Sequence, residues 1–455
     1  MDTGFVRDLP LRNLLRVAFA LVILASGGLV ASHALAADGV DSSTFVHEPQ
    51  GMDSNLTVVT THFNDDRKGS IAAFNESGDV VYRNASYTRY FDVDPVPGRN
   101  QTVTYIAEQN AGKTDCGIAP WSSYTCVTQI IERLDLRTDE TTVLFERTIR
   151  AQRTDSWHDV DRVGPDTWAV ADLFDDRAFV VNTTTGLIEW GWAAAADFDL
   201  DSGGSDKGDW THINDVEQVR GDQFMLSLRN HDQVIFVDQE TGLIENMTLG
   251  ADGEYDVLYE QHNPDYIPAE RGGPAVVVAD SENNRIVEYQ RIDGEWRRSW
   301  TYADVEMEWP RDADRLPNGN TLITDTHSNR IIEVNRSGDV VWEVSYPRAY
   351  EAERLGTGDE SAGGQSAQAL GLTNVTTGGG AAAVSGGGGG GLKGAVESVV
   401  PAKIRHGVLW VVPPWATFFD VFLLAVFAFT LLVWAGAELY WTDRVRFRSP
   451  VVLDR

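Results

Sequence analysis

The sequence has very little cysteine and lysine, and both shortages limit what the protein can be. Of its 455 residues only two are cysteine, and only five of its 37 basic residues are lysine, against 68 acidic residues. The formal net charge is −31, and such a field repels nucleic acid and excludes it as a partner. In molar salt the Debye length is only about 3 Å and this self-repulsion is screened. The composition therefore favours a halophilic source.

Familiar catalytic motifs are also missing. The sequence contains no Gly-rich phosphate loop, no nucleophile elbow built on serine and no HExxH metal motif. The reaction classes that depend on those motifs are excluded.

The two cysteines, Cys116 and Cys126, lie in one segment, DCGIAPWSSYTC, which offers too few ligands for a metal site. Eight Asn-x-Ser/Thr sequons, typical of glycosylated surface loops, indicate export: Asn55, Asn75, Asn84, Asn100, Asn182, Asn246, Asn335 and Asn374. In an oxidising exterior the cysteine pair predicts a disulfide across a loop.

The sequence does contain a repeat of about 50 residues. Its clearest unit, residues 209–238, opens with His-x-Asn, turns at Arg-Gly-Asp and continues as two short strands, FMLSL and QVIFVD. Four units open at His158, His212, His262 and Arg311, which are 54, 50 and 49 positions apart. Each interval accommodates four strands, as in a propeller blade. With two weaker units, residues 57–82 and 102–145, the pattern predicts an all-β, six-bladed β-propeller over residues 38–350.

Both ends of the chain indicate a membrane. Residues 1–37 combine basic residues with an apolar run and predict either a signal peptide or a signal-anchor helix. Residues 356–394 are Gly-rich and predict a flexible linker, followed by a juxtamembrane segment, 395–414, and a transmembrane helix, 415–437. The tail, 438–455, carries Arg444, Arg446 and Arg448, which favour the cytoplasmic side. We expect a cell-membrane protein with an extracellular propeller.

The repeat also predicts where a site lies. The first strand of each propeller blade lines the central channel, so equivalent positions in different blades converge. We expect His158, His212 and His262 to meet there with Arg311, although duplication of a structural His-x-Asn pattern would give the same spacing. Arg229 follows FMLSL near the same region, and its guanidinium suits a tetrahedral oxyanion.

Further residues are assigned around this site. Asn214 and Asn263 stand beside two of the histidines and are expected, with Arg311, to contact substrate. Arg177, Arg285 and Arg330 recur at blade turns and predict ion pairs, and His231 and His327 lie in similar loops and are expected to be structural. The pattern assigns no role to His62.

Imidazoles beside a guanidinium suit group transfer. Neutral imidazole, with an ordinary pKa near 6.5, is a nucleophile or base at neutral pH. An arginine would neutralise charge on the transferred group. Three histidines could instead hold zinc or a similar ion with an open coordination position.

Three ordered motifs carry a resemblance to a known family. HDVDRV around His158, DWTHINDVEQV with the following SLR, and QHNPDYI around His262 resemble successive motifs of the arylsulfotransferases. These propeller enzymes use an aryl sulfate directly as donor, independently of 3'-phosphoadenylylsulfate. The similarity covers roughly residues 157–347.

The resemblance implies a reaction and roles for these residues. His262 would become sulfated and pass the sulfuryl group to a phenolic or other hydroxyl acceptor, with no cofactor. His158, His212 and Arg229 would bind and polarise the group. The composition and apolar ends suggest a membrane-anchored member of haloarchaeal type. The alternative is a non-enzymatic propeller that binds a glycan or a protein partner.

Overall fold

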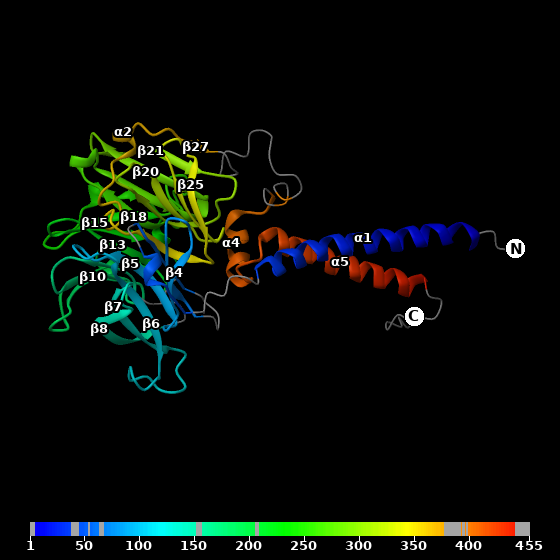
Figure 1. Ribbon diagram of the computed structural model, residues 1–455, viewed down its shortest axis with the longest axis horizontal. Helices are drawn as coiled ribbons and strands as arrows, with labels where there is room; N and C mark the ends of the chain where they lie inside the picture. Colours follow the sequence, from blue (N-terminus) through cyan, green and yellow to red (C-terminus); the bar gives the residue numbers. More distant parts are fainter. Residues whose placement is uncertain are drawn as a thin grey trace, which may run out of the picture. The chain divides into compact units, whose positions relative to one another are not determined.

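The computed structural model describes residues 5–37, 45–52, 55–62, 68–151, 157–204, 209–376 and 399–441, with the isolated positions 393 and 396. The chain divides into two compact units. One is helical and is formed by both ends of the chain, and the other is a β unit formed by the residues between them (Figure 1).

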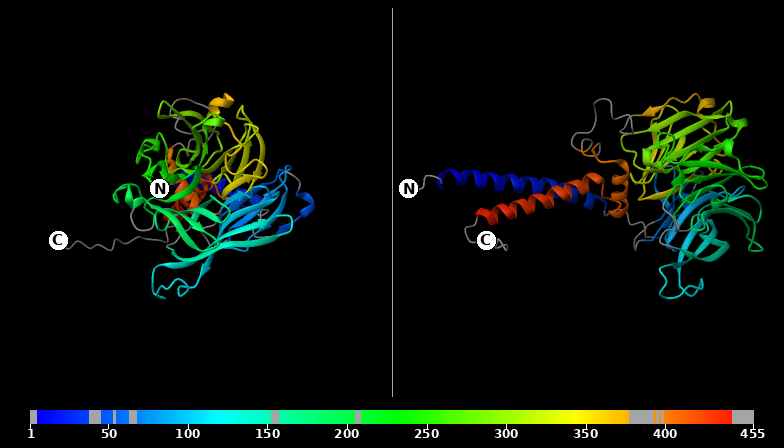
Figure 2. Two further views of the ribbon diagram at one scale, coloured as in Figure 1. Left: turned by 90° about the vertical axis from the view of Figure 1, so that its left-hand side faces the viewer. Right: turned by 180° about the vertical axis from the view of Figure 1, so that it is seen from behind.

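The helical unit consists of α1 (Phe5–Ala37), α4 (Ala402–Val411) and α5 (Phe418–Trp441). Two of its segments, Leu11–Leu35 and Phe418–Trp441, are long and apolar enough to span a membrane. α1 and α5 lie side by side (Figures 1 and 2) and are joined near both ends. Arg16 Nη2 donates to Glu438 Oε2 at 2.7 Å, and His33 Nδ1 lies 2.8 Å from Asp420 Oδ1. The predicted basic residues of the tail beyond position 441 lie outside the described residues.

The β unit is a six-bladed propeller, as the repeat predicts (Figure 2). The blades, with strands given from the channel outward, are as follows. Blade 1 contains β26 (Ala349–Arg354), β2 (Thr57–Thr61), β3 (Ser70–Phe74), β4 (Val80–Asn84) and β1 (Val46–His47). Blade 2 contains β5 (Arg89–Pro95), β6 (Thr102–Ala111), β7 (Thr125–Asp135) and β8 (Glu140–Ala151). Blade 3 contains β9 (Trp157–Arg162), β10 (Thr167–Asp172), β11 (Arg177–Asn182) and β12 (Leu187–Ala193).

The other three blades follow in chain order. Blade 4 contains β13 (Ile213–Arg220), β14 (Gln223–Leu228), β15 (Gln233–Asp238), β16 (Gly242–Leu243) and β17 (Leu249–Gly250). Blade 5 contains β18 (His262–Ile267), β19 (Ala275–Asp280), β20 (Arg285–Ile292), β21 (Glu295–Ala303) and β27 (Val375–Thr376). Blade 6 contains β22 (Pro310–Arg315), β23 (Thr321–Asp325), β24 (Arg330–Val334) and β25 (Val340–Ser345).

The propeller closes through β26, which comes from the end of the unit and pairs antiparallel with β2 from its beginning. The predicted boundary at residue 350 is therefore wrong, because it cuts through the strand that completes blade 1. The unit predicted to start at residue 102 likewise begins earlier, since β5 is the innermost strand of blade 2. Each innermost strand contacts the next around a closed ring: β26, β5, β9, β13, β18 and β22.

Apolar side chains hold neighbouring blades together. Between blades 2 and 3, for example, Ile106, Ile131, Val170 and Phe179 are fully or almost fully buried in one cluster. Alternate residues of each strand face opposite sides of its sheet, so both faces of a blade contribute to such clusters. The core thus fixes the inner strands around the channel.

The three repeated arginines form the ion pairs that the sequence predicts. Each donates through Nε to the aspartate five residues earlier, across the turn between a blade's second and third strands. The pairs are Arg177 with Asp172 at 2.9 Å, Arg285 with Asp280 at 2.6 Å and Arg330 with Asp325 at 2.8 Å.

The segment predicted as a flexible linker from Gly356 is packed on the propeller as far as Thr376. The hydroxyl of Ser361, a buried residue, accepts from the Arg315 backbone N–H at 2.7 Å and donates to Asp265. Ser366 caps the short helix α2 (Ala367–Leu370), and β27 pairs with β21. Glycine composition was misleading here because polar and apolar contacts order the segment. Residues 377–392 of the predicted linker lie outside the described residues.

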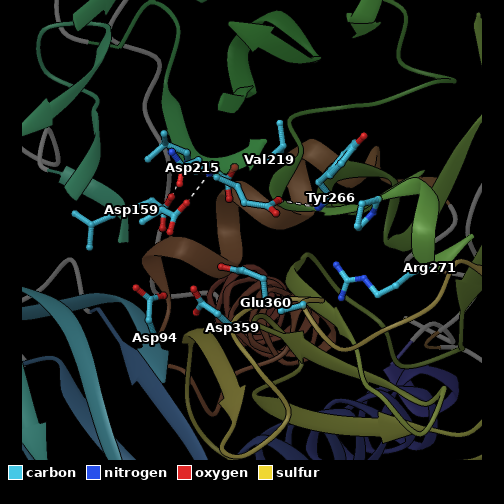
Figure 3. Close-up of a pocket in the computed structure, with 15 residues that line it drawn as sticks. Asp94, Asp159, Asp215, Val219, Tyr266, Arg271, Asp359 and Glu360 are labelled. Carbon is cyan, nitrogen blue, oxygen red and sulfur yellow. Dashed lines mark hydrogen bonds between the residues drawn. The ribbon is translucent and has the colours of Figure 1, made fainter. Parts of the chain in front are cut away.

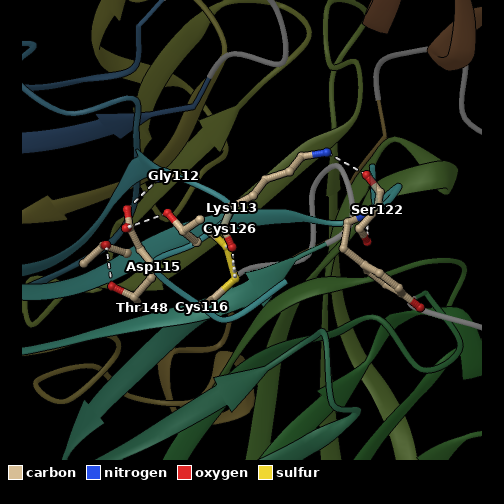
Figure 4. Close-up of a disulfide and its surroundings, with 10 residues drawn as sticks. Gly112, Lys113, Asp115, Cys116, Ser122, Cys126 and Thr148 are labelled. Carbon is tan, nitrogen blue, oxygen red and sulfur yellow. Dashed lines mark hydrogen bonds between the residues drawn. A yellow bond between two sulfur atoms is a disulfide. The ribbon is translucent and has the colours of Figure 1, made fainter. Parts of the chain in front are cut away.

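The predicted disulfide is present. Cys116 and Cys126 are bonded, with their Cα atoms 5.9 Å apart, in the connection between β6 and β7 (Figure 4). Cys126 already belongs to β7, where it pairs with Ala111 of β6. The bond therefore ties the connection to the hairpin from which it extends.

Candidate active site

The six innermost strands share a β-bulge at the same end of the channel. Each interrupts its ladder within its first few residues: at Phe91 and Asp92, His158, Asn214, Asn263 and Pro264, Arg311, and Tyr350. A bulge leaves residues unpaired and re-aims side chains. The six bulges lie around one end of the channel. Each changes the direction of the side chains next to it, so side chains of all six blades can point into one common volume.

The structure brings the three predicted histidines together at this end. The ring centroids of His158 and His212 are 5.3 Å apart, and those of His212 and His262 are 6.5 Å apart. Arg311 lies over the ring of Tyr350 at 4.2 Å. The convergence expected from the repeat spacing is therefore present in the fold.

Residues that the sequence did not assign complete the ring. His62 stacks on Phe91 at 5.5 Å and contacts Tyr350 at 5.2 Å, while Phe91 in turn stacks on His158 at 5.3 Å. Trp309 meets His262 at 4.6 Å. The repeat pattern does not place Tyr350 and His62. The innermost strand of blade 1, β26, comes from the C-terminal end of the β unit, so the repeat unit seen in the sequence for blade 1 starts at its second strand.

One ring nitrogen of His262 is held by a hydrogen bond, and the other is buried without a partner among the described residues. Its Nδ1 lies 2.8 Å from Ser281 Oγ, and that hydroxyl donates to the Ala279 carbonyl oxygen at 3.4 Å. The tautomer in which Nδ1–H donates to Oγ is compatible with both contacts, and it leaves the imidazole lone pair on Nε2. Nε2 is buried with no hydrogen-bond partner among the described residues.

The surroundings keep His262 neutral. Burial lowers the pKa of His262 well below its ordinary value, and the positive charges of Arg311 and Arg229 lower it further. Burial likewise lowers the pKa of His158 well below its ordinary value, with further contributions from His212 and Arg311. A buried, neutral imidazole with a bare nitrogen is a nucleophile.

His212 is oriented by a carboxylate. Its Nδ1 forms a short hydrogen bond with Asp209 Oδ1, which leaves Nε2 on the opposite side of the ring. Burial lowers the pKa of His212, as does Arg229, although Asp209 opposes the shift. The backbone N–H and hydroxyl of the preceding Thr211 donate to Asp176, at 2.9 and 2.7 Å, and fix this loop. This arrangement resembles an imidazole base with its orienting acid.

Two arginines bring positive charge to the same place. Arg229 lies in the 3-10 turn η3 (Arg229–His231); it donates to Glu260 and, at 3.0 Å, to Asn230, while its buried Nε has no partner among the described residues. Arg311 is buried and lies 3.3 Å from His62 through Nη1. Burial lowers the pKa of Arg311 to about 10, so it stays charged at neutral pH. Two guanidiniums beside neutral imidazoles suit an anionic ligand.

The two predicted asparagines connect parts of the propeller. Asn214 Nδ2 donates to the Gln261 carbonyl oxygen at 3.0 Å, and Asn263 Nδ2 donates to Glu351 Oε2 at 3.1 Å. The amide oxygens of both are buried and accept no hydrogen bond from the described residues. The amide groups thus tie the strand of one blade to that of another.

The two loop histidines that the sequence assigns a structural role, His231 and His327, have different surroundings. His231 packs on Phe198 and Trp210, and its Nε2 lies 3.0 Å from Ser202 Oγ, away from the ring of histidines. The ring of His327 stacks on Trp309, with the ring centroids 5.0 Å apart. Trp309 also contacts His262, so it lies between the two histidines in this chain of contacts.

The histidines do not form a metal site of the kind that the sequence left open. Among the described residues, the groups of possible metal ligands whose atoms lie within 4.8 Å of one another contain carboxylates only. Except for Glu360, which follows β26, those carboxylates lie on the inner strands. Asp94 and Glu360 also line a cavity of about 250 Å³, together with two further carboxylates of the inner strands, Asp159 and Asp215 (Figure 3).

Comparisons with known proteins agree with the motifs in the sequence. A family model described as Arylsulfotransferase (ASST) matches residues 166–347, which include His212, Arg229, His262 and Arg311 but not His158. Among curated proteins, none matches this chain.

Similar solved structures include the periplasmic gluconolactonase PpgL of Pseudomonas aeruginosa, with 13% identity, TM-score 0.44 and coverage of 67% of this chain and 99% of the other. A nidogen/laminin complex follows with 14% identity, TM-score 0.40 and coverage of 66% and 97%. A virginiamycin B lyase from Staphylococcus aureus has 10% identity, TM-score 0.36 and coverage of 64% and 84%. Nothing about the function of this chain follows from these three.

Proposed function

We propose that the propeller transfers a sulfuryl group from an aryl sulfate to a phenolic or other hydroxyl acceptor, through a sulfated His262. The observation that carries the proposal is the bare, buried Nε2 of His262, with its lone pair fixed by Ser281 and two arginines close by. The family match over residues 166–347 supports the same chemistry.

In the first half-reaction, the lone pair of His262 Nε2 forms a bond to sulfur as the bond from sulfur to the aryl oxygen breaks. The electron pair leaves on the phenolate oxygen. Arg311 and Arg229 stabilise the charge on the sulfuryl oxygens, and the Nδ1–H of the sulfated ring stays bonded to Ser281. His158 lines the same volume and contacts the sulfuryl group.

In the second half-reaction, the acceptor hydroxyl oxygen attacks sulfur and the bond between Nε2 and sulfur breaks. His212 Nε2 takes the hydroxyl proton, and Asp209 stabilises the imidazolium that forms. The proton then passes to solvent or to the departed phenolate, so atoms and charge balance over the two half-reactions.

The test is a trapping experiment with a chromogenic aryl sulfate and no acceptor. The peptide that contains His262 should gain the mass of one sulfuryl group, and the His262→Ala variant should gain none. His212→Ala should still turn over, but about 10² to 10³ times more slowly, as expected for the loss of one stabilising group. His47→Ala, in β1 at the outer edge of blade 1, is the control and should behave as the wild type.

Turnover that is unchanged in His262→Ala would contradict the assignment of the nucleophile. A wild type that turns over no aryl sulfate would favour the alternative, a propeller that binds a glycan or protein partner.

We also infer that the propeller faces the cell exterior and that the protein is anchored in the membrane. All eight sequons lie between the two apolar segments. Three arginines follow the second apolar segment: Arg444, Arg446 and Arg448. This charge pattern favours cytoplasmic ends.

A further inference from the structure

The inner strands carry two rows of carboxylates below the ring of histidines. The first row lies at the bulges, with Asp92 inside its bulge and the others directly after theirs: Asp92, Asp159, Asp215, Asp265, Asp312 and Glu351. The second row lies two positions further along: Asp94, Asp161, Glu217, Asp314 and Glu353. Residues two apart in a strand face the same side, so both rows face the channel. The residues between them, such as Val160 and Val216, are buried in the apolar clusters between blades.

Four of the carboxylates come together in one group. Asp265, Asp312, Asp314 and Glu360 each offer an oxygen, and these oxygens all lie within 4.8 Å of one another. They come from β18, β22 and the segment after β26, so three separate parts of the chain meet there. Each aspartate is only 1% exposed.

Only some oxygens of this group have hydrogen-bond donors. Asp312 Oδ2 accepts from Thr324 at 3.3 Å and from the Ala352 backbone N–H at 3.4 Å, and Asp265 Oδ2 accepts from Ser361. The Oδ1 atoms of both, and both oxygens of Asp314, are buried without a hydrogen-bond partner among the described residues. The neighbouring Arg315 donates to Glu288 at 3.1 Å and lies over the ring of Trp300. Among the described residues Asp314 is therefore an unpartnered buried carboxylate, and Asp265 and Asp312 each have one unpartnered oxygen beside it. Burying such groups is costly, and four unpartnered oxygens in one place indicate a missing positive charge.

We propose that Asp265, Asp312, Asp314 and Glu360 bind a hard divalent cation of the Ca²⁺ type in the channel. Carboxylate oxygens are the ligands that Ca²⁺ prefers, at about 2.3 to 2.6 Å. Two ligands on opposite sides of such an ion stand about 4.8 Å apart, which the group accommodates. A second group, formed by Asp92, Asp94, Glu351 and the same Glu360, has the same spacing. Glu360 belongs to both groups of carboxylates, so both candidate cation sites depend on it.

Protons are the competing way to reduce this charge. Burial raises the pKa of Asp265 to about 6 and that of Asp314 well above its ordinary value. If protonation alone neutralises these carboxylates, the group needs no metal ion. A direct measurement of bound metal distinguishes protonation from metal binding.

The experiment uses the full chain in detergent at constant NaCl concentration, stripped with EDTA and dialysed against ⁴⁵Ca²⁺. We expect at least one bound Ca²⁺ per chain, and a Tm higher by about 5 °C when Ca²⁺ is at about 100 times its Kd. Glu360→Gln and Asp314→Asn should each weaken Ca²⁺ binding at least about tenfold. Asp222→Asn removes one charge from an exposed turn and should bind Ca²⁺ as the wild type does.

Wild type that binds no Ca²⁺ after stripping would overturn the proposal, and this arm needs no variant to fold. Equal affinity in wild type and Glu360→Gln would overturn it as well. If Asp314→Asn is unstable, Glu360→Gln decides, because Glu360 lies in a loop rather than in a strand. None of these measurements depends on turnover of an aryl sulfate.

Discussion

His262 Nδ1 and Ser281 Oγ are 2.8 Å apart, and this contact decides which imidazole nitrogen faces the channel. Ser281 lies in the 3-10 turn (Ser281–Asn283) after β19, the strand that pairs with the strand carrying His262. The turn therefore places the Ser281 hydroxyl beside Nδ1 of the imidazole. A bulge follows His262 in its own strand. Ser281 occupies the turn between the second and third strands of blade 5, and we predict that the reactivity of His262 depends on it.

Ser281→Ala should lower kcat/KM about fivefold, because a hydrogen bond of about 1 kcal/mol that holds the ring and its tautomer is lost. Steady-state kinetics with a chromogenic aryl sulfate measure this. Ser202→Ala is a matched control, since Ser202 forms the same kind of contact with His231 away from the channel. An equal loss in both variants would show a general effect on folding instead of a specific one.

Acid should inhibit only well below the ordinary pKa of histidine. The proton competes with sulfur for the Nε2 lone pair, so activity falls as pH drops through the pKa of His262. That pKa is lowered by burial first, and then by Arg311, Arg229, His212 and His158. We therefore expect kcat/KM for a phenyl sulfate to stay constant down to below pH 6.5. In Arg311→Gln the acid limb should move to higher pH, because one positive charge is gone. An acid limb at or above pH 6.5 in the wild type would contradict the lowered pKa.

The sequence predicted the centre of the site well because repeat spacing converts directly into position around a propeller. His158 and Arg311 are the bulge residues of their inner strands. His212 lies two positions before the bulge residue Asn214, and His262 directly precedes a bulge. The repeat spacing was therefore close enough to predict the convergence, although the four positions are not equivalent. His62 and Tyr350 could not be placed in this way. Blade 1 is assembled from both ends of the β unit, and the pairing of β26 with β2 is a long-range contact that leaves no periodic signal.

The carboxylate rows could have been found in the sequence. HDVD at 158–161, NDVE at 214–217, RDAD at 311–314 and YEAE at 350–353 repeat an acidic residue at every second position of the inner strand. The packing of residues 357–376, in contrast, depends on single contacts such as the Ala367 N–H to Glu288, at 2.8 Å, which composition does not reveal.

Removal of the disulfide should destabilise the propeller. Cys116 and Cys126 are ten positions apart, and closing a loop of this size contributes about 3 kcal/mol through the entropy of the unfolded chain. The double variant Cys116→Ser/Cys126→Ser should therefore unfold at a lower denaturant concentration than the wild type. Reducing agent should lower the wild-type midpoint to that of the variant and leave the variant unchanged. A reductant-insensitive wild type would show that the bond adds no stability.

Protease should reach the propeller from outside the cell. If the propeller is extracellular, protease added to intact cells should cut between residues 377 and 392 and release a fragment that contains the blades. The segment after 441 should be cut only after lysis. The opposite pattern, with release of the propeller only in lysed cells, would show that the orientation is inverted.

The first helix should remain in the mature protein, as an anchor rather than a cleaved signal peptide. Within the helical unit, Asp420 is fully buried and faces His33, and Glu438 pairs with Arg16, so cleavage after α1 and loss of that helix would leave two acidic groups of α5 without these partners. The mass of the purified chain should therefore include residues 11–35. A side chain added at Gly27 would lie about 3.0 Å from the ring of Phe427. A short bifunctional maleimide should thus link Gly27→Cys to Phe427→Cys, whereas Leu29→Cys, at a half-exposed position on the other side of α1, should not link to Phe427→Cys. A mature chain that begins near residue 38 would contradict the prediction.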